Sequence, residues 1–224
     1  MIMSLFGNMF DKKEKTKEVA ATPVTQETIG NSVSMPAGGG MLNLQKNDIL
    51  NLSKAAPSLD RVRLAGGWDM VRRGADYDLD LCAFLLDECG RLVKKVNSCV
   101  YFGQKRSEGI HLDKDNLTGA GDGDDENIYV TLSKIPDFVH KIVFAVVIYN
   151  PGMSQSFSGV KNAYVRLVDS DRNDVEICRY NLSADGGNNT AVTVAELFRD
   201  RGEWSFKAVG EYSRDSISSL KRNY

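Results

Sequence analysis

Histidine is scarce in this sequence, with only His111 and His140 among 224 residues. Zinc sites are usually built from cysteine and histidine, and acid–base catalysis most often uses histidine, so both functions have few candidate residues. Basic residues are not in excess either: 28 lysines and arginines face 30 aspartates and glutamates, which gives a net charge of −2. Proteins that bind nucleic acids usually carry a basic face. We therefore expect no nucleic-acid partner.

Cysteine is also sparse and unpatterned. The four cysteines stand at positions 82, 89, 99 and 178, without a CxxC pair or a regular spacing. Disulfide frameworks are typical of small secreted chains, and metal-binding cysteines come at short fixed spacings. We therefore expect four free thiols with a structural role, in a reducing compartment.

Long apolar runs are missing as well. The longest, Ile142–Tyr149, has the length of a strand, whereas a membrane-spanning helix needs roughly 18 apolar residues. The apolar opening of the chain is followed by Lys12, Lys13 and Lys15, whereas a secretory signal places its basic residues first. The sequence predicts a cytoplasmic protein, with a peripheral position at the inner face of the membrane as the alternative.

Residues 1–40 have the composition of a tether. They are rich in lysine, threonine, serine, proline and glycine, and they offer too little apolar surface to offset the entropy lost on ordering. We predict a flexible N-terminal extension. Within its first ten residues, Ile2, Leu5, Phe6 and Met9 have helical spacing. This opening is either a short amphipathic helix that docks on a partner or a membrane surface, or a disordered start.

Residues 41–224 are expected to form one domain with the pattern of an all-β protein. Segments rich in branched aliphatic and aromatic residues alternate with turn residues. The predicted strands are Val62–Leu64, Leu79–Leu86, Val96–Phe102, Ile128–Leu132, Ile142–Tyr149, Ala163–Val168, Val175–Leu182 and Trp204–Val209. Ala191–Arg199 has the spacing of a short helix, and Gly202 follows it as a break. The prediction is a two-sheet β-sandwich with a short helix near the C-terminal part.

Three aspartates alternate at the start of one predicted strand. In Asp76-Tyr-Asp78-Leu-Asp80 the carboxylates share one face, and neighbours stand about 6.6 Å apart along an extended chain. Like charges placed side by side destabilise a strand unless something neutralises them. The spacing is not that of an EF-hand, because position twelve counted from Asp76 is Asp87 rather than glutamate. The pattern favours a bound cation over the alternative of a solvated strand edge.

A second acidic segment lies at residues 113–126. It holds six carboxylates against one lysine, a net charge of −5, whereas the whole chain carries −2. Its three glycines let the backbone turn tightly and present carbonyl oxygens. Calcium takes about six to eight oxygen ligands in irregular geometry, while magnesium keeps more water, so calcium is favoured. With Asp69 close to the first cluster in sequence, two ions are expected; the alternative is an acidic surface loop.

Several motifs are shared with one known family. They are Gly67-Trp68-Asp69, Asp76-Tyr-Asp78-Leu-Asp80, Asp115-Asn116-Leu-Thr118-Gly119-Ala-Gly121-Asp122-Gly123-Asp124-Asp125-Glu126, Asn162-Ala163-Tyr164-Val165-Arg166, Arg179-Tyr180-Asn181-Leu182-Ser183, Glu196-Leu197-Phe198-Arg199 and Gly202-Glu203-Trp204-Ser-Phe206-Lys-Ala208-Val209-Gly210. Over roughly residues 42–224 the chain thereby resembles the TerD family of tellurium-resistance and general-stress proteins. The resemblance implies a calcium-binding β-sandwich that serves in resistance to tellurite and other stresses, within membrane-associated complexes.

The resemblance also implies a set of metal ligands. Carried over position by position, the side chains are Asp69, Asp76, Asp78, Asp80, Asp115, Asn116, Asp124, Asp125 and Glu126, with backbone oxygens around Thr118, Gly119 and Gly121. Asp80 lies deeper in its strand and either binds the ion or holds the loop through hydrogen bonds. Two positions depart from the family pattern: Lys114 stands where glycine is common, and Asn181 where aspartate is common.

The leading functional hypothesis is a calcium-binding, non-catalytic module of a stress response, in which the ions clamp a surface that protein partners recognise. No small-molecule substrate is evident. One alternative is a two-metal phosphoesterase or nuclease, since paired metal ions held by aspartates catalyse phosphoryl chemistry. A second alternative is a calcium-dependent binder of membrane surfaces, which the apolar opening and its lysines would support.

Overall fold

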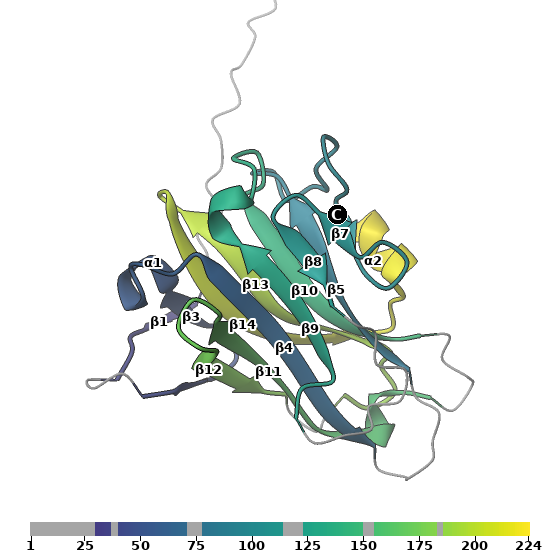
Figure 1. Ribbon diagram of the computed structural model, residues 1–224. Coiled ribbons are helices and arrows are strands. Elements are labelled where there is room, and N and C mark those ends of the chain that lie inside the picture. Colours follow the sequence, from purple (N-terminus) through teal and green to yellow (C-terminus); the bar gives the residue numbers. More distant parts are fainter. Residues whose placement is uncertain (1–29, 37–39, 71–77, 114–122, 150–154, 183–185) are drawn as a thin grey trace, which may run out of the picture.

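Two sheets of seven strands each are packed face to face in the computed structural model, which describes residues 30–36, 40–70, 78–113, 123–149, 155–182 and 186–224 (Figure 1). The first sheet has the order β1-β3-β14-β13-β10-β5-β6, and the second has the order β2-β12-β11-β4-β9-β8-β7. The predicted two-sheet β-sandwich is therefore confirmed.

The strands of the first sheet are β1 (Asn31–Val33), β3 (Asp48–Asn51), β14 (Glu203–Ser213), β13 (Ala191–Asp200), β10 (Lys141–Ile148), β5 (Leu79–Leu86) and β6 (Cys99–Val100). Those of the second sheet are β2 (Leu42–Leu44), β12 (Val175–Asn181), β11 (Val160–Asp169), β4 (Arg61–Met70), β9 (Glu126–Thr131), β8 (Ile110–Leu112) and β7 (Arg106–Ser107). The helices are α1 (Leu52–Ala55) and α2 (Ile217–Asn223), with 3-10 turns η1 (Leu132–Lys134) and η2 (Phe157–Gly159).

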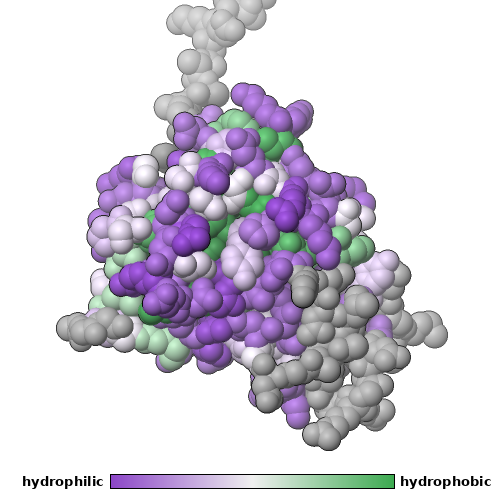
Figure 2. All heavy atoms as spheres, in the orientation of Figure 1, coloured by the Kyte–Doolittle hydropathy of each residue, from purple (hydrophilic) through white to green (hydrophobic). Residues whose placement is uncertain are grey.

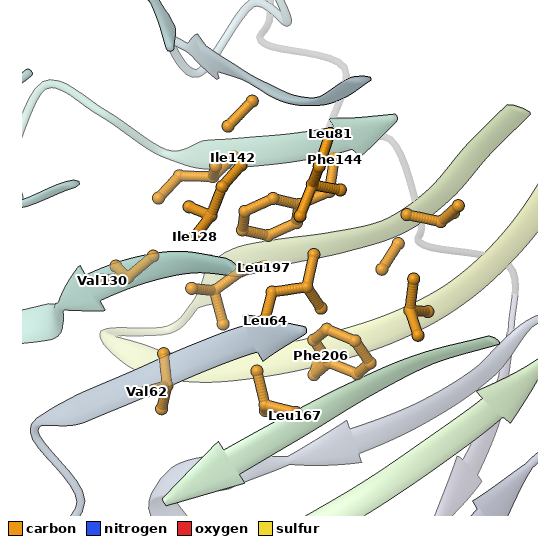
Figure 3. Close-up of a cluster of buried hydrophobic side chains, with 14 of the residues drawn as sticks. Val62, Leu64, Leu81, Ile128, Val130, Ile142, Phe144, Leu167, Leu197 and Phe206 are labelled. Carbon is orange, nitrogen blue, oxygen red and sulfur yellow. The ribbon is translucent and has the colours of Figure 1, made fainter. Parts of the chain in front are cut away.

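The main core lies between the two sheets. Along β9, every second side chain is buried, which places Ile128 and Val130 on the inner face. They meet Leu64 from the same sheet and Phe144 and Phe206 from the opposite one (Figure 3). Hydrophilic residues predominate on the face of the molecule in Figure 2. Alternation of apolar and polar residues along the strands thus produces the layered core.

A second apolar cluster covers the outer face of the first sheet, where α2 packs. Leu220 of α2 is 5% exposed, and the Tyr224 ring lies 5.5 Å from the Phe84 ring. Because the central strands β5 and β10 are covered on both faces, nearly all of their residues are buried. This explains why Leu79–Leu86 and Ile142–Ile148 are almost continuous apolar runs.

The helix predicted over Ala191–Arg199 is wrong, because these residues form β13. The register of β13 shifts between Thr193 and Ala195 against both of its neighbours. This bulge changes the phase of the strand, so that Val192 and Ala195 both face the main core although they are three residues apart. Such spacing imitates a helix. The C-terminal part does contain a short helix, but it is α2.

The N-terminal extension shows a difference from the sequence prediction. Asn31–Val33, inside the segment predicted to be a flexible tether, form β1 beside β3. The remainder of the predicted tether before Gly30, including the amphipathic opening, lies outside the described residues.

One end of the sandwich gathers the acidic segments. Met70 pairs with Val160 at this end, and Leu79 pairs with Ile148 in the other sheet. Glu126 starts β9 there and contacts Leu81 across the two sheets. In the described part of the chain, no helix is long and apolar enough to span a membrane.

Candidate functional site

Three strand ends bring acidic side chains to the same end of the molecule. Asp69 is the penultimate residue of β4, Asp78 and Asp80 stand at the start of β5, and 124–126 lead into β9. The other predicted ligands, namely Asp76, Asp115, Asn116, Thr118, Gly119 and Gly121, lie outside the described residues. The two acidic clusters found in the sequence therefore converge in space, as far as the described residues go.

Glu126 connects the two sheets. Its side chain is fully buried, and one carboxylate oxygen accepts a hydrogen bond from the Leu81 amide at 2.5 Å. Leu81 lies beyond the two residues of β5, Ala83 and Phe84, that pair with β6. The carboxylate thus satisfies a backbone donor that β6 does not reach, and it fixes the start of β9 against the start of β5.

Asp125 is attached to β4 through both its backbone and its side chain. Its amide donates to the Gly66 carbonyl at 2.8 Å, and its carboxylate accepts from the Trp68 amide at 2.9 Å. Burial raises the pKa of Asp125, and the negative charges of Asp69 and Asp124 raise it further, against the opposing hydrogen bond from Trp68. The ionised form of this carboxylate is therefore destabilised, which is a condition that a nearby cation would relieve.

Asp124 has the opposite surroundings. Its side chain is 8% exposed, and it accepts from Arg166 Nε at 2.8 Å and Nη2 at 2.6 Å, from Arg63 Nη1 at 2.9 Å and from Tyr164 OH at 3.0 Å. A carboxylate has about four acceptor positions, so these donors use its capacity in this conformation. Burial raises the pKa of Asp124, but the hydrogen bonds and charge of Arg166, with Tyr164 and Arg63, outweigh it and leave the pKa lowered.

The arginines around Asp124 belong to a network on the outer face of the second sheet. Arg166 also donates to Glu176 at 2.9 Å, and Glu176 receives two further hydrogen bonds from Arg179. Arg179 lies over the Tyr164 ring, 4.2 Å from its centre. Burial, followed by the charge of Asp124, raises the pKa of the Tyr164 phenol to about 12. The network thus holds Asp124 against β4, β11 and β12.

A glycine leaves room for Tyr164. A Cβ atom at position 67 would lie 2.5 Å from the Tyr164 hydroxyl oxygen. The Gly67 in the Gly-Trp-Asp motif is therefore needed for close packing on this face. The sequence pattern alone did not predict this network. The available signal was the presence of opposite charges at alternate positions of two neighbouring predicted strands, such as Arg166 and Glu176.

Asp69 and Asp80 differ in exposure. Asp69 is exposed and accepts a hydrogen bond from the Asn162 side chain at 2.7 Å. Asn162 has a φ of 52° at the point where the β11–β4 register shifts. Asp80 is 2% exposed and lies on the face of β5 that carries Cys82, away from the main core. Its charge is one of the causes that raise the pKa of the Cys82 thiol, after burial and the neighbouring Cys99.

Within the described ranges, no three or more histidine, cysteine, aspartate or glutamate side chains form a group arranged to hold a metal ion. The residues that are described do have the right chemistry, because carboxylate oxygens are the donors that calcium prefers.

The fold and this acidic end define a class of protein. It is a two-sheet β-sandwich in which the ends of three strands bring carboxylate side chains to one end of the molecule. The TerD domain model matches residues 41–224, so the chain belongs to the TerD family. The resemblance seen in the sequence is confirmed.

Related proteins and structures agree with this assignment. Tellurium resistance protein TerD of Serratia marcescens is 39% identical over 186 residues, which cover 82% of this chain and 96% of that protein. General stress protein 16U of Bacillus subtilis (strain 168) is 37% identical over 188 residues, with the same coverage. The crystal structure of a homologue of telluride resistance protein (TerD) from Streptomyces coelicolor A3(2) superposes with a TM-score of 0.59 at 24% identity, covering 73% of this chain and 96% of that one. This last likeness supports the fold alone.

Proposed function

We propose that this chain binds calcium at its acidic end, has no catalytic activity, and serves as a metal-clamped binding module in a stress response of the tellurium-resistance type. The names of its relatives support the stress-response part, since they are called tellurium resistance and general stress proteins. The calcium part rests on the acidic end of the sandwich.

The observation that carries the proposal is the unequal treatment of neighbouring carboxylates. Two arginines neutralise the charge of Asp124. Burial and neighbouring negative charges instead raise the pKa of Asp125. A divalent cation beside Asp125 would offset this repulsion and favour the ionised carboxylate. Asp124 would then act as the anchor that presents Asp125 to the ion.

The proposed ligands follow from this division of roles. Asp69, Asp78 and Asp125 supply carboxylates from the three strand ends, and Asp76, Asp115 and Asn116 join them from the adjoining segments, with backbone oxygens of Thr118, Gly119 and Gly121. Asp80 and Glu126, which are 2% and 0% exposed, belong to the proposed set from within β5 and from the first position of β9. Two calcium ions are proposed. Calcium is preferred to magnesium because it accepts many oxygen ligands without strict octahedral geometry.

The experiment is calorimetric titration of chelator-treated protein with calcium and, separately, with magnesium, together with melting temperatures. We expect calcium to bind with a Kd of about micromolar or tighter and to raise the melting temperature, because it binds the folded state alone. Asp125→Asn should weaken calcium binding by about tenfold or more. Asp137→Asn is the matched control, because Asp137 is fully exposed near the start of β10, at the opposite end of the sandwich.

Absence of any heat with calcium, in protein whose folding is verified, would refute the metal proposal. Turnover of phosphoesters or nucleic acids that is lost in Asp125→Asn would instead favour a two-metal hydrolase. We further propose that the module works in the cytoplasm, where protein partners of a membrane-associated complex recognise the calcium-bound end. The test is to recover partners of this chain from cytoplasmic extracts, once with calcium and once with chelator. The same partners under both conditions would contradict recognition of the calcium-bound end.

A further inference from the structure

Strand β1 lies outside the residues that match the family, yet it is paired with the sheet. Asn31, Ser32 and Val33 run parallel to Asp48, Ile49 and Leu50 of β3, at the outer edge of the first sheet (Figure 1). The Asn31 amide also donates to the Asn47 carbonyl at 2.9 Å. The family match begins at residue 41, so this strand is an addition to the domain that the relatives share.

The segment that contains β1 has one inward and one outward face. Val33 and Met35 are partly buried and pack against the main core, whereas Ser32 and Ser34 are exposed. Val33 stands beside Leu50, which is 1% exposed. Alternation of this kind is what an extended peptide shows when it binds along a sheet edge, with backbone pairing and apolar contacts at every second residue.

Gly30 fits the edge because it has no side chain. A Cβ at this position would lie 2.5 Å from Ile49 Cδ1 and 2.7 Å from the Asn47 carbonyl oxygen. The first contact involves a side-chain end that can move, but the second involves backbone. The edge of β3 therefore selects glycine at the position before the paired residues.

The domain itself holds the receiving surface in place. Asn47 has a φ of 69°, and its amide donates to the Ala208 carbonyl of β14 at 2.8 Å. The Asp48 carboxylate accepts from the Gln45 amide at 2.7 Å, which closes the turn before β3. These contacts are made without residues 30–36, so the Asn47 carbonyl is oriented independently of the strand that it accepts.

We propose that the outer edge of β3 is a binding site for an extended peptide of the pattern Gly-x-x-Val-x-Met. In this chain residues 30–35 occupy it, and the same segment of a second copy binds there when the edge is open. An open strand edge presents unpaired amides and carbonyls, and a parallel strand of three residues satisfies them over a short length. Covalent attachment places the chain's own segment at an effective concentration of about millimolar, so the attached segment normally excludes the one in trans.

The first experiment measures hydrogen exchange in the full chain. Gly30→Val introduces the clash with Asn47, so we expect the amides of residues 30–36, and those of β3 that face the edge, to exchange about tenfold faster or more. Ser34→Ala is the matched control, since it alters an exposed side chain in the same segment, and its exchange should equal that of the wild type. Unchanged exchange in Gly30→Val would overturn the proposal.

The second experiment tests binding in trans. A fluorescent peptide of residues 30–36, Gly-Asn-Ser-Val-Ser-Met-Pro, is titrated into the Gly30→Val chain and into the wild type. We expect saturable binding to the variant that is about tenfold tighter than to the wild type, whose own segment competes. A peptide with valine in place of its glycine should not bind. Equal binding of the glycine and valine peptides would refute the site. So would the absence of binding to the Gly30→Val chain when hydrogen exchange shows that its β3 edge has opened. The proposal does not depend on calcium, so the result should be the same in chelator.

Discussion

Asp124 and Asp125 are adjacent in the chain but have opposite electrostatic surroundings. Asp124 is held by two arginines and a tyrosine, and its pKa is lowered, while the pKa of Asp125 is raised by burial and by neighbouring carboxylates. The first carboxylate therefore stabilises the fold as an anion, and the second is charged at a cost to the fold. At the scale of single residues, the acidic end thus contains one carboxylate whose anion is stabilised and a neighbouring one whose anion is destabilised.

This contrast predicts opposite effects of two amide substitutions in chelator. Asp124→Asn should lower the free energy of unfolding by about 2–4 kcal/mol, because it removes the anion that the largely buried Arg63 and Arg166 share, although Arg166 keeps its ion pair with Glu176. Asp125→Asn should leave stability unchanged or raise it by up to about 1 kcal/mol, because it removes repulsion. Urea denaturation in chelator measures both, with the exposed Asp137→Asn as control. Equal losses at the two positions would contradict the division of roles.

Glu176 predicts a dependence on pH. Burial raises its pKa, but the hydrogen bonds and charges of Arg179 and Arg166 outweigh this, so the pKa is below its usual value of 4.5. A lowered pKa in the folded state gives stability that is present above about pH 4.5 and is lost as the pH falls through the folded value. Glu176→Gln should therefore cost about 1–2 kcal/mol at pH 7 and progressively less in acid. Urea midpoints of both proteins across this range, in chelator, test it, and a cost of Glu176→Gln that does not change with pH would contradict it.

Bulges decide more of this fold than the sequence pattern suggests. In β13 the register shift after Thr193 gives the apolar residues of a strand the spacing of a helix. In its partner β14, two residues between Ala208 and Glu211 have no pairing partner in β13. Gly210 is one of them and has a φ of 66°. A Cβ there would collide with the Tyr180 hydroxyl of the opposite sheet. At the scale of elements, the two sheets fit together because this residue has no side chain.

Gly210→Ala is therefore expected to destabilise the protein by about 2–4 kcal/mol, through backbone strain and the collision with Tyr180. Tyr180→Phe removes the hydroxyl, so the same glycine substitution should cost less in that background. Thermal or urea unfolding of the two single variants and the double variant measures the coupling. Strictly additive losses would show that the contact with Tyr180 does not contribute.

The exposure and the thiol pKa of each cysteine depend on how the two sheets and α2 pack together. Cys178 lies in the core between the sheets, Cys82 and Cys99 lie on the outer face of the first sheet beneath α2, and Cys89 is exposed. Burial raises the pKa of Cys99 to about 11 and of Cys178 to about 12, and it raises that of Cys82 well above its usual value. All four thiols are free, as predicted.

We therefore expect one thiol to react with an aromatic disulfide reagent at pH 8 in the native protein, and all four after denaturation. Cys89→Ser should remove the native reaction. Leu220→Ala, which loosens α2, should speed the reaction of Cys99 without affecting that of Cys178. Fast native reaction of Cys178 would contradict the packing of the two sheets described here.

The sequence alone was sufficient to predict the β-sandwich, most of its long strands, the family and the convergence of two acidic segments. The sandwich and its strands follow from local alternation and from composition, which act over a few residues, whereas the family follows from a resemblance in motifs and the convergence from the charge of the two segments. It did not predict β13, the short edge strands such as β1 and β7, or the arginines that neutralise Asp124. The partners of those residues lie far away in the chain: Asp124 and Arg166 are brought together only because β4 places β9 and β11 on its two sides. Which of the two carboxylates has its pKa lowered by arginines and which has its pKa raised is thus decided by the tertiary structure, because electrostatic energy depends on distance in space and on burial.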